Sequence, residues 1–287
     1  MLTLPAPAKL NLMLHIVGRR EDGYHLLQTQ FQFLNFCDQL TFTATDKNSQ
    51  SPAIELTPQI PGVSNENNLI VKAARQLISF CRKKGITKPL ADIQIRLDKK
   101  IPMGGGLGGG SSDAATALVG LNKIWQLGCT TDELADIGLS LGADVPVFIR
   151  GNAAWAEGVG EKLTPIEPKE LYYVVICPNC HISTQEIFCH PELTRDTEIM
   201  TITRALDQGG HNDCEPIVKA AYNEVAEALD WLGQFGKSQM TGTGACIFAG
   251  FDNEAAAQAV IQSLPDHWQG FVTRGINKSP LYRALAN

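Results

Sequence analysis

Polar and apolar side chains alternate along residues 9–16, and a period of two is typical of a β-strand with one buried face. One face of this predicted strand carries Lys9, Asn11, Met13 and His15. The opposite face carries Leu10, Leu12, Leu14 and Ile16. A Glu-Asp-Gly turn signal follows at 21–23. The next apolar runs predict two further strands, over 26–36 and 39–45.

A polar, Pro-rich loop is predicted over 51–67, with one short strand at 53–56. Apolar residues then recur at helical spacing from Leu69, and Gly85 ends that helix because glycine favours the position just after a helix. Alternation returns over 91–97, which predicts another strand.

A clear amphipathic helix is predicted over 114–125. The Thr-Thr-Asp-Glu sequence at 130–133 is a capping box, so a second helix begins there and ends at Gly142. Pro146 disfavours the helical conformation at the residue before it, so we expect Val145 to be extended and the chain to lack a regular continuation.

The second half of the chain alternates strands and helices. The predicted strands are 171–176, 246–251 and 271–275, and the predicted helices are 217–232 and 253–264. The segment 157–169 is rich in Gly, Pro and charge, so we place a boundary there. This division gives an N-terminal domain over 1–162 and a C-terminal domain over 163–287.

The composition is that of an ordinary globular protein. The chain has 287 residues, of which 44% are hydrophobic and 19% are charged, enough for a sizeable core. Disorder, collagen and coiled coil are therefore excluded. The formal net charge is −6, and sequence-independent nucleic-acid binding needs a basic face. We expect no nucleic-acid partner.

No targeting or membrane signal stands out. No uncharged apolar run approaches about 18 residues, and the N-terminus has no basic segment followed by an apolar one. The eight cysteines are too sparse for a disulfide scaffold. We therefore expect a cytoplasmic protein with reduced thiols and no membrane partner.

One cluster of cysteine and histidine residues has the composition of a zinc site. It contains Cys177, Cys180, His181, Cys189 and His190. The second Cys-His pair is adjacent in sequence rather than spaced, and Cys177 ends an apolar run where cysteine commonly packs as a small hydrophobe. We expect packing and loop roles and no metal site, with a redox or metal effect as the minor alternative.

Six of the 26 glycines lie between Gly104 and Gly110. A strand, a glycine-rich turn and a helix N-terminus together make an anion site, because backbone N–H groups and the helix dipole face the ligand. Ser111 and Ser112 are expected to cap the helix or to offer hydroxyls to phosphate or Mg²⁺. A flexible linker is the alternative, but the short, tightly bracketed loop favours phosphate binding.

The known phosphate motifs do not fit this loop. A G-x-G-x-x-G pattern is almost inevitable among so many glycines, and the acidic residue expected about 20 positions on falls in helix and cap rather than after a strand. A Walker loop needs a lysine before the serine, and none is present. The protein-kinase H-R-D and D-F-G motifs are also missing.

Three motifs in order resemble the galactokinase, homoserine kinase, mevalonate kinase and phosphomevalonate kinase (GHMP) superfamily. They are PAKLNL at 7–12, PMGGGLGGGSSDAA at 102–115 and TGTGAC at 241–246. REDGYH at 20–25, GADVPVF at 142–148 and NDCE at 212–215 are more specifically similar to the 4-diphosphocytidyl-2-C-methyl-D-erythritol kinases within it. The resemblance covers essentially the whole chain.

The resemblance implies an α+β fold with two lobes: an N-terminal α/β sandwich that holds the nucleotide and a ferredoxin-like C-terminal lobe. It implies ATP-dependent phosphorylation of the 2-hydroxyl of 4-diphosphocytidyl-2-C-methyl-D-erythritol, in the non-mevalonate route to isoprenoid precursors, with Mg²⁺ carried by ATP. A homoserine or mevalonate type of kinase is the alternative. A non-catalytic nucleotide-binding regulator is a third reading, and monomer and homodimer both stay open.

The resemblance also implies the catalytic pair. Asp144 would be the general base that takes the hydroxyl proton, and Lys9 would lie beside it and stabilise developing charge. From the residues alone, Asp144 could be a local capping residue before a proline, and Lys9 a solvated surface residue. The polar strand face that Lys9 shares with Asn11 and His15 favours a strand that faces a site. We expect His15 to be structural.

The remaining site residues follow from the same resemblance. Tyr24 and Phe188 would stack on the cytosine, and His25 would read its edge. The substrate side is Asn11, Tyr24, His25, Thr184 and Phe188. The ATP side is Asn68, Leu69, Lys99, Pro102, Met103, Gly104, Gly105, Gly106, Leu107, Gly108, Gly109, Gly110, Ser111 and Ser112. Asn68 could instead be only a helix N-cap, and Lys99 ordinary surface charge. The loop at 241–244 would either approach the substrate phosphates or support the first glycine loop.

Overall fold

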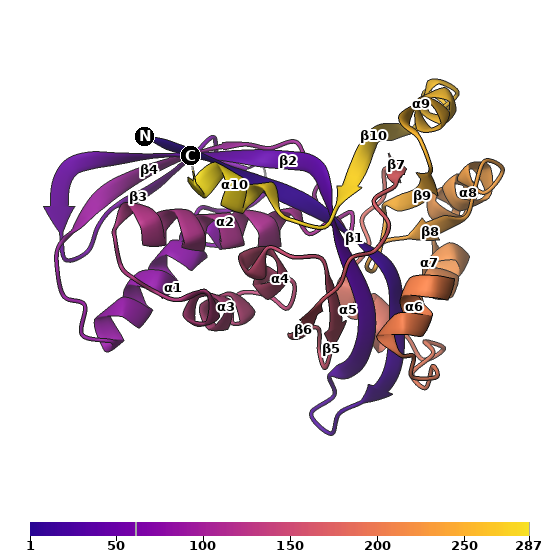
Figure 1. Cartoon of the computed structure of the whole chain (residues 1–287), viewed down its shortest axis with the longest axis horizontal. Helices are drawn as coiled ribbons and strands as arrows, with labels where there is room; N and C mark the ends of the chain where they lie inside the picture. Colours follow the sequence, from indigo (N-terminus) through magenta and orange to yellow (C-terminus); the bar gives the residue numbers. More distant parts are fainter. Residues whose placement is uncertain (61, 287) are drawn as a thin grey trace.

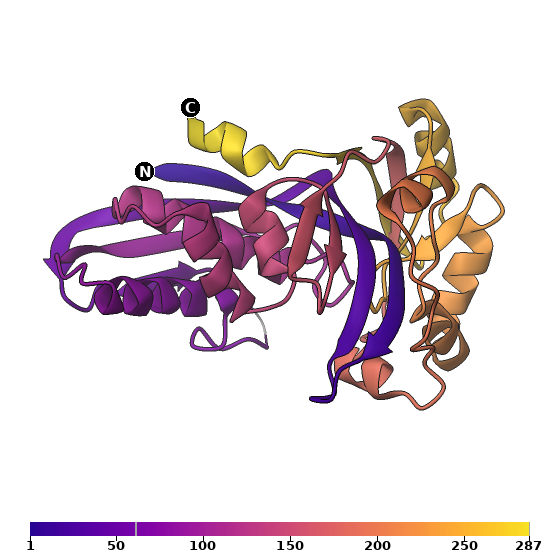
Figure 2. The same cartoon turned by 60° about the horizontal axis from the view of Figure 1, so that its bottom comes forward.

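A computed structural model describes residues 1–60 and 62–286, and it shows a two-lobed α+β protein (Figure 1). One sheet runs through both lobes in the order β3-β4-β2-β10-β7-β9-β8. Helices α1 to α4 lie along the N-terminal part of this sheet, and α7, α8 and α9 lie along its C-terminal part (Figure 1 and Figure 2). The α+β class expected from the sequence is confirmed.

Two long antiparallel strands form the frame of the N-terminal lobe: β1 (Leu2–Arg19) and β2 (His25–Ser49). β4 (Leu90–Asp98) pairs with β2, and β3 (Ile54–Thr57) pairs in parallel with β4. The prediction of two separate strands over 26–36 and 39–45 is wrong. A register shift in the β1–β2 pairing between Pro7 and Lys9 marks a bulge that breaks the alternation without ending the strand.

Four helices build the N-terminal core beside these strands. They are α1 (Leu69–Lys83), α2 (Gly109–Ile124), α3 (Thr131–Leu139) and α4 (Val145–Arg150). Their apolar faces share one buried cluster with the strands. The capping box is confirmed: Thr130 accepts from the backbone of Glu133, and the Glu133 side chain accepts from Thr130. The expectation of an extended Val145 is wrong, because Pro146 stands in the first turn of α4, where its missing N–H costs nothing.

The segment expected to be a linker contains a hairpin. β5 (Ala154–Glu157) pairs with β2, and β6 (Lys162–Pro165) pairs with β5. These strands are four residues each, so they are too short to show a clear period in the sequence.

The C-terminal lobe has four antiparallel strands in the order β10-β7-β9-β8. They are β7 (Tyr172–Cys177), β8 (Ser238–Met240), β9 (Ile247–Phe251) and β10 (Gln269–Ile276). Helical segments connect β7 to β8, and α9 (Glu254–Gln262) connects β9 to β10. This β-α-β-β-α-β arrangement is the ferredoxin-like pattern.

The helical connection between β7 and β8 contains α5 (Thr184–Cys189), α6 (Ile202–Gln208), α7 (Glu215–Ala221) and α8 (Asn223–Leu232). The single long helix predicted over 217–232 is wrong, because Tyr222 is extended and separates α7 from α8. Both helices pack on the same core, so their apolar spacing continues across the break.

The end of the chain returns to the N-terminal lobe. Gly275 and Ile276 of β10 pair with β2, and the last helix, α10 (Pro280–Ala286), lies along that lobe (Figure 1). Leu281 is fully buried in the N-terminal core. Within residues 1–60 and 62–286, no helix has the length and apolar character needed to cross a membrane.

Candidate active site

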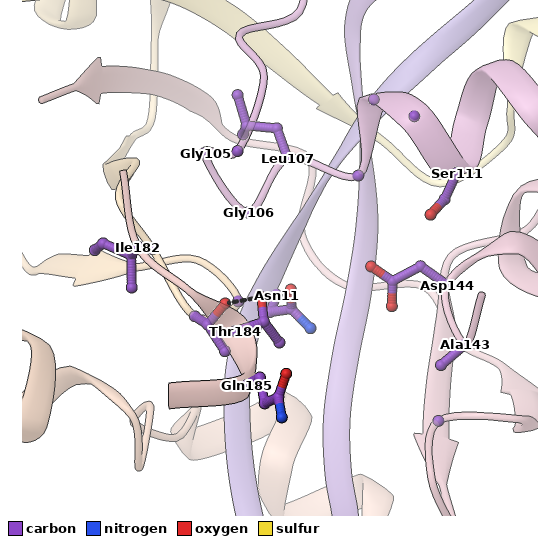
Figure 3. Close-up of a pocket in the computed structure, with 18 of the residues that line it drawn as sticks. Asn11, Gly105, Gly106, Leu107, Ser111, Ala143, Asp144, Ile182, Thr184 and Gln185 are labelled. Atoms are coloured by element: carbon purple, nitrogen blue, oxygen red, sulfur yellow. Dashed lines mark hydrogen bonds between the residues drawn. The ribbon is translucent and has the colours of Figure 1, made fainter. Parts of the chain in front are cut away.

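A cavity of about 1250 Å³ brings the predicted residues together. Its lining comes from both halves of the chain, and part of that lining is drawn in Figure 3. Every site residue expected from the sequence lines it except Ser112.

The first glycine loop packs too closely on its neighbours for side chains. Gly106 has φ +76°, and a Cβ there would overlap the carbonyl oxygen of Thr241. Gly108 has φ +71° and is the N-cap of α2, where a Cβ would stand 2.9 Å from the ring of Phe148. The loop therefore presents bare backbone at the start of a 16-residue helix, which is the geometry that favours an anion.

The loop at 241–244 supports the first glycine loop and also faces the cavity. The Thr241 hydroxyl donates to the carbonyl oxygen of Gly106 at 3.3 Å, and the Cys246 N–H donates to Gly105 at 3.1 Å. Asn212 holds the second loop from behind by donating to the carbonyls of Met240 and Gly242, both at 2.8 Å. The two glycine loops are thus one packed unit.

The two serines after the loop behave differently from each other. Neither caps α2, because Gly108 is the N-cap and no side chain bonds there; the capping expectation is wrong. The side chain of Ser111 lines the cavity. Ser112 is fully buried, and its hydroxyl has no hydrogen-bond partner. Of the two hydroxyls, only that of Ser111 faces the cavity.

Lys9 is buried, with 2% of its surface exposed, so it is not a solvated surface residue. Its ammonium nitrogen lies 3.3 Å from the Asp144 carboxylate and 2.9 Å from the Gly106 carbonyl oxygen, and it also donates to the Asn11 side chain. The ring of Phe31 lies 5.4 Å from the same nitrogen. These acceptors compensate for the cost of burying the charge. They also tie the glycine loop to Asp144.

Asp144 stands immediately before α4, yet its side chain makes no capping hydrogen bond. This observation removes the local reading of Asp144 as a cap. The carboxylate is 34% exposed and opens into the cavity. Figure 3 shows Asp144 and Ala143 across the cavity from Ile182, Thr184 and Gln185. A substrate hydroxyl in the cavity can therefore reach this carboxylate.

Asn11 lines the cavity but is 4% exposed, and its side chain is engaged on both sides. Its carbonyl oxygen accepts from Lys9, and its amide donates to the Thr29 hydroxyl at 2.9 Å. Its backbone N–H donates to Thr241 at 2.9 Å. Asn11 therefore holds Lys9 in place in this structure.

Asn68 is the N-cap of α1, and it also lines the cavity beside Leu69. Its carbonyl oxygen accepts from the Ile70 N–H at 2.9 Å. The remaining amide hydrogens are not used in that cap.

Lys99 lines the cavity but bridges two buried carboxylates, at 2.5 Å from Asp38 and 2.8 Å from Asp113. Burial lowers the pKa of Lys99, but the two carboxylates more than offset it and raise the net value. Burial raises the pKa of Asp113 to about 7, against the lowering effect of Lys99. One oxygen of Asp113 is buried without a partner. Lys99 is therefore no ordinary surface charge.

The three residues predicted to bind the cytosine, Tyr24, His25 and Phe188, also line the cavity. Tyr24 is 65% exposed in the turn after β1. The His25 and Phe188 rings stack, with centroids 5.2 Å apart and planes 29° from parallel. The guanidinium of Arg195, which does not line the cavity, donates to His25 at 3.1 Å.

Several residues that line the cavity were not expected from the sequence. One of them is Thr243, whose hydroxyl pairs with that of Thr184 at 2.9 Å. The others include Arg19, Thr29, Phe31, Asp113, His181 and Gln185. Thr29 and Phe31 are on the face of β2 next to Lys9, so strand alternation alone could have suggested them.

The cysteine cluster has no zinc-like geometry. All eight cysteines are free, and the sulfurs of Cys177 and Cys246 lie 3.1 Å apart. In the part of the chain that the structure describes, no three His, Cys, Asp or Glu side chains are grouped so as to hold a metal.

Comparison with protein families identifies the class that this fold and site define. Residues 68–152 match the model described as GHMP kinases N terminal domain, and residues 192–270 match GHMP kinases C terminal. A crystal structure of mevalonate kinase has a TM-score of 0.69 at 13% identity and covers 97% of this chain and 100% of its own, which shows the shared fold.

More similar proteins define the branch. A Marinobacter nauticus protein described as 4-diphosphocytidyl-2-C-methyl-D-erythritol kinase is 51% identical over 99% of this chain and 97% of its own. A Nitrosococcus oceani protein of the same description is 52% identical over 99% and 98%. A crystal structure of 4-(cytidine 5'-diphospho)-2C-methyl-D-erythritol kinase has a TM-score of 0.78 at 30% identity and covers 96% and 100%. The chain belongs to the 4-diphosphocytidyl-2-C-methyl-D-erythritol kinase family of the GHMP kinases.

Proposed function

We propose that this protein transfers the γ-phosphoryl group of ATP to the 2-hydroxyl of 4-diphosphocytidyl-2-C-methyl-D-erythritol and releases the 2-phosphate and ADP. The observation that carries the proposal is the ion pair between the buried Lys9 and the cavity-facing Asp144, held against the glycine loop in one large cavity. The two relatives above 50% identity carry the matching description. Homoserine and mevalonate kinases resemble this chain at 13–15% identity, which supports the fold alone.

The step needs charge neutralisation and a positioned alcohol more than covalent chemistry from the protein. The substrate hydroxyl oxygen forms a bond to the γ-phosphorus, and the bond from that phosphorus to the bridging oxygen of ADP breaks. The hydroxyl proton goes to the carboxylate of Asp144. Lys9, fixed by Asn11 and Gly106, holds that carboxylate in place and contributes positive charge beside the transferred group.

The backbone N–H groups of the glycine loop and the N-terminus of α2 (Gly109–Ile124) would bind the phosphates of ATP. The Ser111 hydroxyl and the Asp144 carboxylate line the same cavity, and such hard oxygen donors suit Mg²⁺ that arrives with the nucleotide (Figure 3). When bound, Mg²⁺ neutralises phosphate charge. Asn68, Leu69 and Lys99 would flank the adenine, and Tyr24, His25 and Phe188 would bind the cytidine.

The division into lobes over 1–162 and 163–287, the cytoplasmic location, the lack of nucleic-acid or membrane partners and the choice between monomer and homodimer stay predictions from the sequence.

The first test is Asp144→Asn. Loss of the base should lower kcat by about 10²-fold to 10⁴-fold, while ATP still binds, because the amide keeps the shape but cannot take a proton. The measurement is an ADP-release assay with the cytidylated substrate. Asp132→Asn is the matched control, since Asp132 is 79% exposed and pairs with Arg150 outside the cavity. Full activity in Asp144→Asn would refute the assignment of the base.

The second test is Phe188→Ala. Loss of the stacking ring should raise KM for the cytidylated substrate by about twofold to tenfold and leave KM for ATP nearly unchanged, because one aromatic contact is worth about 0.5–1.5 kcal/mol beyond its buried area. Phe235→Ala, at a 43% exposed phenylalanine outside the cavity, is the control. An unchanged KM in Phe188→Ala would remove Phe188 from the substrate site.

A further inference from the structure

Arg195 lies behind the cytidine end of the cavity and is fully engaged there. Its Nε donates to Nε2 of His25 at 3.1 Å. Its two terminal nitrogens donate to four backbone carbonyls at 2.7–3.4 Å. These carbonyls belong to Phe188, His190, Pro191 and Leu193. The guanidinium is therefore held rigidly by the segment that begins at Phe188, the predicted stacking residue.

This contact determines where His25 carries its proton. A guanidinium has N–H donors only and stays charged in proteins, so its partner atom must be an acceptor. Nε2 of His25 therefore carries a lone pair, and in a neutral imidazole the proton is then on Nδ1. His25 lines the cavity, whereas Arg195 does not.

The surroundings keep the ring neutral. Burial lowers the pKa of His25, and the positive charges of Arg195 and of Arg19 at the end of β1 lower it further. The other charged residues of the adjoining turn are Arg20, Glu21 and Asp22, and Arg20 pairs with Asp22 at 2.7 Å.

We propose that Arg195 is a positioning residue that locks His25 in the Nδ1–H form and thereby makes the cavity select cytosine over uracil. The inference rests on the proposed function, because His25 and Phe188 are its cytidine end. At ring position 3, cytosine has a lone pair, whereas uracil has an N–H. The Nδ1–H of His25 can donate to the lone pair of cytosine, whereas in uracil it would face another N–H donor.

The size of the preference follows from hydrogen bonding. Two opposed donors that are partly removed from water leave both unsatisfied, and each such loss is worth about 1–3 kcal/mol. A site built for one hydrogen-bonding pattern therefore rejects the other more strongly than a purely apolar pocket would. We expect about 10-fold to 100-fold tighter binding of the cytosine form. Without Arg195, the imidazole can move its proton to Nε2 and accept from uracil.

The first experiment observes the tautomer in the wild-type protein. ¹⁵N NMR of ring-labelled histidine should show Nδ1 of His25 protonated and Nε2 unprotonated at neutral pH, with the signal assigned by its loss in His25→Gln. A His25 that is protonated on Nε2, or that carries both protons at pH 7, would overturn the proposal. This readout needs neither substrate nor turnover.

The second experiment measures binding of cytidine 5′-diphosphate and uridine 5′-diphosphate by calorimetry. The wild type should bind the cytidine form more tightly. In Arg195→Met this preference should fall below about threefold. The affinity of this variant for the two nucleotides should also become pH-dependent near the ordinary histidine pKa of about 6.5. Arg204→Met is the control, since Arg204 is on α6, outside the cavity, and pairs with Glu198 at 3.6 Å.

An unchanged preference in a folded Arg195→Met variant would refute the proposal. If that variant does not fold, because four carbonyls lose their partner, the wild-type NMR result decides alone. Failure of the proposed function looks different: the cytidylated alcohol would not be phosphorylated, while the tautomer and the preference between the two bases would remain measurable.

Discussion

At the scale of the residue, charge burial controls the chemistry near the glycine loop. Lys9 is surrounded by acceptors that include Asp144, so its buried charge is compensated. The charge of Asp113 is less well compensated, because its partner Lys99 also pairs with Asp38. One Asp113 oxygen is left without a partner in a buried place, and burial raises the pKa of this carboxyl to about 7.

Asp113 therefore predicts a pH dependence of stability. Its pKa rises from 3.8 in the unfolded chain to about 7 in the folded one. Protonated Asp113 makes its full contribution to the free energy of unfolding below pH 4, and this contribution is lost as the pH rises through about 7. The side chain in Asp113→Asn cannot ionise, so the variant does not lose this stability. The difference in melting temperature, variant minus wild type, should therefore increase as the pH is raised from 5 to 7.5.

Thermal unfolding across that pH range is the measurement. Asp98→Asn is the control, because Asp98 is 61% exposed and should leave the pH dependence unchanged. If wild type and Asp113→Asn change in parallel with pH, Asp113 does not titrate in this window.

At the scale of the element, the two glycine loops act as one unit because backbone lies on backbone. Gly106 is left-handed and touches Thr241, and its carbonyl accepts from Lys9. A side chain at Gly106 would force the loops apart and move the first glycine loop away from Lys9 and Asp144. Not every glycine of the cluster is required in this way, since a Cβ at Gly110, inside α2, would make only an ordinary van der Waals contact.

Gly106→Ala should lower the free energy of unfolding by about 1–3 kcal/mol, through strain and overlap with Thr241, and should weaken ATP binding. Gly110→Ala is the matched control, because its nearest neighbour, Leu69, would be 3.5 Å from the new Cβ. Alanine inside a helix is worth about 0.5–1 kcal/mol over glycine, so this variant should be slightly more stable. Chemical denaturation compares them, and equal effects at both positions would contradict the argument.

At the scale of the whole molecule, the last strand and helix join the two lobes. β10 pairs with β7 through residues 269–274 and then with β2 through Gly275 and Ile276. α10 (Pro280–Ala286) then places Leu281 in the N-terminal core. The arrangement of the cavity between the lobes thus depends on the end of the chain.

Leu281→Ala should lower the free energy of unfolding by about 2–5 kcal/mol, because a fully buried leucine leaves a cavity. Leu206→Ala makes the same change at a leucine that is 40% exposed on α6, and it should cost less than about 1 kcal/mol. Denaturant unfolding of both variants is the measurement. Similar losses would mean that α10 does not hold the N-terminal lobe together.

Local patterns in the sequence were sufficient for most elements. The alternation in β1, the cap at Thr130 and the helical spacing of α1 and α2 each depend on neighbours in sequence, so the chain itself carries them. Three details were wrong for the same reason: Pro146 inside α4, the extended Tyr222 and the continuous β2 are consistent with local rules but are decided by packing partners.

The sequence by itself determined the class of the protein: its α+β order of elements, its glycine-rich loop before a helix and its membership in a kinase family. Tertiary structure decided how the residues are used. Only folding buries Lys9 against Asp144, links Lys99 to two carboxylates, and sets Arg195 against His25, 170 positions away. Distances and burial between remote residues determine charge and proton position, and no local pattern along the chain contains them.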